Sequence, residues 1–203
     1  MTQTRSLVVA RTALLASALS FVSLPFIATA QDAGTAPSGP QTFTGRDRAT
    51  GAIGQAGATL ELGNGARIVI PPRLPIGNSR VLTLASSRRR IRATQVAPGF
   101  AMVGPTFQFD GAIDATRRPL VISLRARRFR TKAGHRLVLA IENAGICTDE
   151  NRRYPLGQGL CSTWDLVDAT YDAGEQRISA QVTNPGGYRL QFGWVPQQAQ
   201  RGQ

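Results

Sequence analysis

Residues 58–70 read ATLELGNGARIVI, and this stretch decides the fold class. Two short runs with alternating apolar residues, 58–62 and 66–70, flank the sequence Gly-Asn-Gly. An Asn-Gly pair between two such runs is the strongest short-range signal for a β-hairpin, because both residues tolerate the positive φ angles of tight turns. Pro71 and Pro72 follow directly, and proline cannot donate a hydrogen bond to a strand ladder. The stretch therefore predicts a β-hairpin that ends at residue 70.

The same pattern of short runs separated by turn residues continues through most of the chain. Gly or Pro interrupts nearly every stretch that might form an amphipathic helix, and turns are expected at 172–175 (DAGE) and 184–187 (NPGG). The chain is therefore expected to form an all-β domain, an antiparallel β-sandwich of about ten short strands. Further strands are expected at 80–85, 89–94, 100–103, 106–110, 119–125, 136–142, 163–170, 176–182 and 188–192.

Alternation within single strands predicts which side chains face the core. The expected strand 136–142 reads RLVLAIE, and three of its apolar residues share one face. The expected strand 188–192 reads YRLQF, so its aromatic and aliphatic residues are expected to point inward. Arg189 and Gln191 occupy the positions between them and are expected to face solvent.

The first 30 residues have the form of a secretory signal peptide. Arg5 and Arg11 give a positive start, residues 12–27 carry no charge, and the sequence Ala-Thr-Ala at 28–30 offers a cleavage site. We expect cleavage after Ala30. An uncleaved membrane anchor is the alternative, although the uncharged run is short for a membrane span.

Composition divides the rest of the chain into three parts. Residues 31–56 are rich in small and polar residues without apolar periodicity, and are expected to form a flexible leader. Residues 57–195 are expected to form the β-sandwich domain, and residues 196–203 a disordered tail. Cleavage would remove two of the 24 basic residues and none of the 12 acidic ones, which leaves a formal net charge of +10. We therefore expect a basic, exported protein that is periplasmic or secreted.

Two cysteines, Cys147 and Cys161, lie 14 positions apart in a segment that resembles a loop. In an oxidising compartment, a chain with two cysteines in all typically forms one disulfide between them. A metal site is the alternative, but two cysteines and the single histidine, His135, are too few for a structural zinc site. The sequence predicts a Cys147–Cys161 disulfide and no metal or other cofactor.

No catalytic site is predicted. His135 is the only imidazole, and the chain has no G-x-S-x-G nucleophile motif. Asp165, Asp168 and Asp172 are the acids that a hydrolase or a calcium site would use, and we interpret them as surface and turn residues. A hydrolase is the least favoured alternative.

Basic residues form two clusters, and every basic residue except Lys132 is an arginine. No acidic residue occurs between Asp114 and Glu142. Guanidinium groups bind phosphate and carboxylate groups through forked, salt-sensitive contacts. The clusters indicate either an anion-binding surface or a solvated face that maintains solubility. The candidate anion-binding residues are Arg88, Arg89, Arg90, Arg92, Arg125, Arg127, Arg128, Arg130 and Lys132.

Several segments between residues 57 and 193 follow one another in a characteristic order. They are LGNGARIVIP at 62–71, GPTFQF at 104–109, RPLVISL at 118–124, WDLV at 164–167, ISAQV at 178–182 and GYRL at 187–190. This series resembles that of ZU5-like domains. The resemblance implies an antiparallel β-sandwich that acts as an interaction module.

Some relatives of that superfamily cleave themselves at a His-Phe-Ser tripeptide before the last strand. Asn184-Pro185-Gly186 stands at that place here and offers neither an imidazole nor a hydroxyl group, so self-cleavage is not expected. We expect an exported, non-enzymatic interaction module of the cell envelope or extracellular space, whose partner is an envelope protein or an anionic envelope polymer.

A binder of polyanions such as lipopolysaccharide, anionic lipid or polymer is the alternative function. Peripheral membrane contact is compatible with both, and cytosolic nucleic acid is not an expected partner.

Overall fold

A computed structural model describes most of the domain. The described residues are 39–74, 81–88, 91–111, 113, 115–149, 151–152, 154–183 and 187–197, and all belong to one compact unit, Thr35–Gln203. The expected signal peptide and residues 31–38 of the expected leader lie outside this part of the chain. Over the described residues, no helix is long and apolar enough to cross a bilayer.

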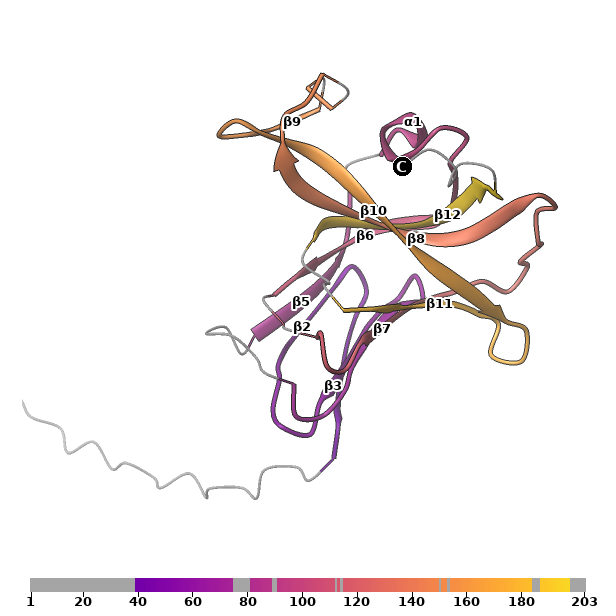
Figure 1. Cartoon of the computed structure of the whole chain (residues 1–203). Coiled ribbons are helices and arrows are strands. Elements are labelled where there is room, and N and C mark those ends of the chain that lie inside the picture. Colours follow the sequence, from indigo (N-terminus) through magenta and orange to yellow (C-terminus); the bar gives the residue numbers. More distant parts are fainter. Residues whose placement is uncertain are drawn as a thin grey trace, which may run out of the picture. The chain divides into compact units, whose positions relative to one another are not determined.

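Nearly all regular structure in the described part is β-strand, which confirms the all-β expectation (Figure 1). One short helix, α1 (Ala93–Val96), is present. The strands are β1 (Gln41–Gly45), β2 (Arg48–Ala52), β3 (Ala58–Leu62), β4 (Ala66–Ile70), β5 (Val81–Ser86), β6 (Ala101–Asp110), β7 (Leu120–Arg125), β8 (His135–Ile146), β9 (Pro155–Gly157), β10 (Leu160–Asp172), β11 (Arg177–Val182) and β12 (Gly187–Pro196).

The strands form one continuous sheet in the order β1-β3-β4-β7-β11-β10-β8-β12-β6-β5-β2, and β9 pairs with β10. Figure 1 shows β10 crossing the domain: its first part, Leu160–Asp168, pairs with β8 and its last part, Ala169–Asp172, pairs with β11. The outermost strands β1 and β2 lie in contact with each other, so the sheet is nearly closed.

The sheet is mixed, because β1 pairs with β3 in parallel while the other described pairs are antiparallel.

The predicted hairpin at residues 58–70 is confirmed as β3 and β4. The Gly65 N–H donates to the Leu62 carbonyl oxygen at 2.9 Å, and the Ala66 N–H donates to Asn64 Oδ1 at 3.0 Å. Gly65 has a φ of 85°, in the region that favours glycine. A Cβ atom there would also lie 2.6 Å from Cβ of Arg125, so glycine is needed both for the turn and for the approach of β7.

Two apolar clusters bury both faces of β8. The main core lies on the inner face of the sheet and includes Leu139 and Ile141, as alternation predicts. A second cluster on the outer face joins Val138 and Ala140 to Phe100 and to residues of α1. This outer layer corrects the expectation that Arg189 and Gln191 face solvent. They do point away from the core, but the outer layer leaves Gln191 with no exposed surface and most of Arg189 covered.

The expected flexible leader is wrong for residues 41–52, which form β1 and β2. The residues are small and polar, so their alternation carries little apolar signal. Gly51 is required because a Cβ atom there would lie 2.2 Å from the ring of Phe43, which packs against the main core. The small residues make room for that ring, and the domain therefore begins before residue 57.

Other boundaries also differ from expectation. The expected strand 89–94 is wrong at its end, because α1 begins at Ala93 and packs on the second cluster. The expected strands 100–103 and 106–110 are joined as β6. Pro196 belongs to β12 and pairs with His135 rather than starting a tail, and residues 198–203 of that expected tail lie outside the described residues.

The predicted disulfide is present and joins Cys147, just after β8, to Cys161 in β10. The two cysteines are 14 positions apart, and closure of a loop of this size stabilises the native state by about 3 kcal/mol in the chain-entropy model.

Replacing both cysteines by serine should lower the free energy of unfolding by about that amount, measured by urea denaturation. Reduction should also raise the intact mass by two hydrogens, and free thiols in the non-reduced protein would contradict the assignment.

Candidate functional site

A pocket of about 730 Å³ lies where the β1–β2 turn, the β3–β4 turn and the end of β7 meet. We call it the arginine pocket, because Arg46, Arg125 and Arg127 line it together with the acidic residue Glu61. Its full lining is Thr44, Gly45, Arg46, Glu61, Leu62, Gly63, Asn64, Gly65, Arg125 and Arg127.

Backbone hydrogen bonds hold the three segments of the arginine pocket in place. The Gly63 N–H donates to the Gly45 carbonyl oxygen at 2.9 Å, which joins the β3–β4 turn to the end of β1. The Arg125 N–H donates to the Gly65 carbonyl oxygen at 3.1 Å, which joins the same turn to β7. The β3–β4 turn therefore lies between the other two segments and fixes the arginines that they carry.

The loop after β7 is anchored by an aromatic contact. Phe129 lies 4.4 Å from Tyr171 and 5.2 Å from Trp194, measured between ring centroids. Phe129 is partly buried against the main core. This contact fixes the loop two residues after Arg127, and Phe129 is a packing residue.

The arginine pocket carries an excess of positive charge. Within the described part of the chain, Arg46, Arg125 and Arg127 form no ion pair. Glu61 is the one carboxylate in the lining, and its Oε1 accepts a hydrogen bond from Nη2 of Arg177 at 3.0 Å. Three arginines against one glutamate give the lining a net charge of +2, and Arg177 already neutralises that glutamate.

The strand register adds to this concentration of charge. Arg125 in β7 lies directly opposite Arg177 in β11, and like charges in directly opposite positions destabilise an antiparallel pair. Burial lowers the pKa of Arg177, Glu61 acts in the opposite direction, and the neighbouring Arg67 and Arg125 lower it further. An anion bound in the pocket would relieve this repulsion.

A second pocket, of about 430 Å³, lies on the outer face of the sheet between β2, β5 and β9. We call it the Glu142 pocket. It contains Glu142, which is completely buried, and three arginines, Arg48, Arg88 and Arg189. Its full lining is Arg48, Ala85, Ser86, Ser87, Arg88, Gln108, Glu142, Leu156 and Arg189.

Glu142 is held by an extensive set of hydrogen bonds. Nε and Nη2 of Arg189 donate to Oε2 and Oε1 of Glu142, both at 2.5 Å, and Oγ of Ser162 donates to Oε1 at 2.6 Å. The guanidinium carbon of Arg189 also lies 5.9 Å from the ring centroid of Trp164. Both carboxylate oxygens are occupied, so this glutamate is a structural acceptor and is not positioned as a general base.

The structure divides the predicted anion-binding residues among several places. Arg125 and Arg127 line the arginine pocket, and Arg88 lines the Glu142 pocket. Arg92 lies next to α1, where its N–H donates to Oε1 of Gln95. The other five either line neither pocket or are not described. Arg128, Arg130 and Lys132 are exposed in the loop after β7, and Arg89 and Arg90 lie outside the described residues.

Sequence reasoning missed several residues of both pockets. Arg46 and Arg48 belong to the segment that was expected to be a leader. Glu61 and Asn64 were read only as parts of a hairpin, and Arg189 as a solvent-facing residue. Arginines flank Asp47 in the sequence, which is a third basic cluster. This cluster indicates an anion-binding position only when β1 and β2 are known to belong to the sheet.

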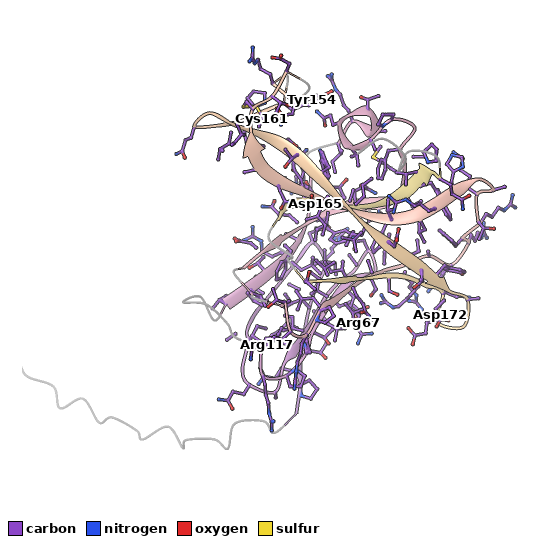
Figure 2. The ribbon with its side chains drawn as sticks, in the orientation of Figure 1. Arg67, Arg117, Tyr154, Cys161, Asp165 and Asp172 are labelled. Carbon is purple, nitrogen blue, oxygen red and sulfur yellow. A yellow bond between two sulfur atoms is a disulfide. The ribbon has the colours of Figure 1, made fainter. Side chains whose placement is uncertain are left out.

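The candidate catalytic groups do not assemble into a site. Nδ1 of His135 lies 2.9 Å from the Ala133 carbonyl oxygen at the start of β8. Asp165 accepts a hydrogen bond from Asn143, Asp168 pairs with Arg136, and Asp172 accepts backbone N–H groups in the β10–β11 turn. Figure 2 shows Asp165 and Asp172 well separated along β10. Among the described residues, no group of three or more His, Cys, Asp or Glu side chains is arranged to hold a metal ion.

Comparisons with known proteins do not identify the domain. No protein-family model matches the chain, and no curated protein matches it. The ZU5-like resemblance therefore stays a prediction.

Proposed function

We propose that the protein is an exported, non-enzymatic binding module that engages an anionic polymer or surface of the cell envelope through the arginine pocket. The observation that carries this proposal is the lining itself: Arg46, Arg125 and Arg127 converge on one pocket, and none of them has an ion-pair partner among the described residues. Each guanidinium group presents up to five N–H donors in a planar fork that matches phosphate or carboxylate oxygens.

The cost of this arrangement to the empty protein also supports a binding function. The opposite positions of Arg125 and Arg177 place two cations together in the sheet, and such a pair destabilises the unliganded domain. A face kept only for solubility would be as well served by arginines that are spread apart. The Cys147–Cys161 disulfide is consistent with export to an oxidising compartment.

We also propose that the continuous sheet is a distorted ZU5-like antiparallel sandwich. Two observations support this part of the proposal. The segment that resembles the opening hairpin of that family forms β3 and β4, and the strand pairs other than β1–β3 are antiparallel in the described residues. An experimental structure would test this proposal. A strand order that differs from that of ZU5-like domains would overturn it.

A salt series of envelope binding tests the proposed function. Residues 31–203 would be mixed with isolated cell envelopes and pelleted at about 50 and 300 mM salt, a range over which exposed charges become strongly screened. We expect most of the protein to pellet at low salt and little at high salt. Binding that resists salt would indicate a specific protein partner instead, and absence of binding at both concentrations would contradict the proposal.

A further inference from the structure

The two pockets share a wall. Nδ2 of Asn64, in the arginine pocket, donates to Oγ of Ser86, in the Glu142 pocket, at 3.1 Å. The Ser86 N–H donates to the Asp47 carbonyl oxygen at 2.8 Å. Asp47 lies between Arg46, which lines the first pocket, and Arg48, which lines the second. The β1–β2 turn and the end of β5 therefore form the junction between two adjoining cavities.

The Glu142 pocket also has positive charge available for an anion. Its single carboxylate is neutralised by the bidentate contact with Arg189. Arg48 and Arg88 are exposed and form no ion pair within the described residues. These two guanidinium groups give the pocket a net charge of +2 once the buried Glu142–Arg189 pair is set aside.

We propose that the arginine pocket and the Glu142 pocket form one extended site for a linear polyanion, a chain that carries phosphate or carboxylate groups at regular intervals. This inference rests on the proposed function and specifies the class of ligand. One anionic group would lie among Arg46, Arg125 and Arg127, the chain would pass the β1–β2 turn, and a later group would meet Arg48 and Arg88. The second contact is intramolecular once the first has formed, so a long chain binds more tightly than a short one.

The carboxylate of Asp47 gives the inference a specific test. It is exposed at the junction, on the turn that the chain would pass. A polyanion that crosses this turn meets an unfavourable charge there, whereas a short anion held in the arginine pocket alone is affected less. Removal of the charge in the variant Asp47→Asn should therefore strengthen the binding of long chains in preference to short ones.

The experiment compares inorganic tripolyphosphate with long-chain polyphosphate by calorimetric titration at about 50 mM salt. Linear polyglucuronate, which carries carboxylate groups, is titrated in the same way. Comparison of its affinity with that of long polyphosphate shows whether the site prefers carboxylate or phosphate groups. We expect the dissociation constant of long polyphosphate for the unmodified protein, expressed per polyphosphate molecule, to be about tenfold lower than that of tripolyphosphate. The Arg88→Ser variant should lose that gain, measured as the ratio of its affinities for the long and the short chain.

Arg117→Ser is the matched control, because it removes the same charge at a residue, labelled in Figure 2, that lines neither pocket. Arg117 precedes β7, whereas Arg125 is the last residue of that strand. It should keep the gain with chain length. Equal loss in Arg88→Ser and Arg117→Ser would overturn the extended site, since it would show only a general effect of net charge. Failure of tripolyphosphate, long polyphosphate and polyglucuronate all to bind the unmodified protein would instead contradict the proposed function. Tripolyphosphate binding without any gain for long chains would contradict the extended site alone.

Discussion

Replacement of both Arg125 and Arg127 by threonine should abolish envelope binding at low salt. The two side chains supply two of the three guanidinium groups of the arginine pocket. A hydrogen bond to a charged group contributes about 1.5–3 kcal/mol, so loss of both contacts should weaken anion binding by about a hundredfold or more. The measurement is the pelleted fraction of the double variant at about 50 mM salt, next to that of the unmodified protein.

The stability of the same variant separates a binding defect from a folding defect. Threonine is favoured in strands, and the substitution at position 125 removes the like-charge pair with Arg177. The double variant should therefore unfold at the same temperature as the unmodified protein or at a slightly higher one. A variant that loses binding only because it is less stable would refute this assignment, as would a variant that binds normally.

The second large effect concerns the stability of the domain. Glu142→Ala should lower the free energy of unfolding by about 3–5 kcal/mol, because it leaves the largely buried Arg189 without its partner. Ser162 would lose its acceptor as well. The measurement is the midpoint of urea denaturation, with the slope used to confirm that the transition stays cooperative.

Two controls make the Glu142 prediction specific. Asp149→Ala breaks the ion pair with Arg152, whose side chains are 94% and 72% exposed, and should change stability by at most about 1 kcal/mol. The double variant Glu142→Leu with Arg189→Met replaces both partners by apolar groups and should recover most of the lost stability. A double variant as unstable as Glu142→Ala would contradict the view that the orphaned arginine causes the loss.

The sequence predicted the parts of the fold that depend on neighbouring residues. The β3–β4 hairpin is an example, because the turn chemistry of Asn64 and Gly65 and the alternation on both sides are local signals. The disulfide was predictable for a similar reason, since Cys147 and Cys161 are the only cysteines. The order of the strands in the sheet depends on long-range pairing, and no local pattern gave it.

Strands made of small residues escaped prediction. In β1 and β2 the inward positions are taken by residues such as Phe43, Ala49 and Gly51, which fit together because the glycine leaves space for the ring. A hydrophobic pattern cannot show this, since small residues look alike in strands and in linkers. The expected start of the domain was therefore too late in the sequence. For the same reason, Arg46 and Arg48 were not predicted as pocket residues.

The candidate site was predicted in part. Clusters of arginines along the chain led to Arg88, Arg125 and Arg127, but proximity in sequence is a poor guide to proximity in space. Arg128 and Arg130 lie within three positions of Arg127 in the chain and yet line neither pocket. Arg46 is distant in the sequence and completes the arginine pocket through the β1–β2 turn.

The most direct test of the arginine pocket is to locate a bound anion on the unmodified protein. An arginine-selective reagent such as phenylglyoxal would be applied with and without tripolyphosphate, and the modified positions identified by mass spectrometry. We predict that the anion protects Arg46, Arg125 and Arg127 and leaves Arg117, which lies outside both pockets, unprotected. Equal modification of these arginines with and without the anion, at concentrations that saturate binding, would contradict the account.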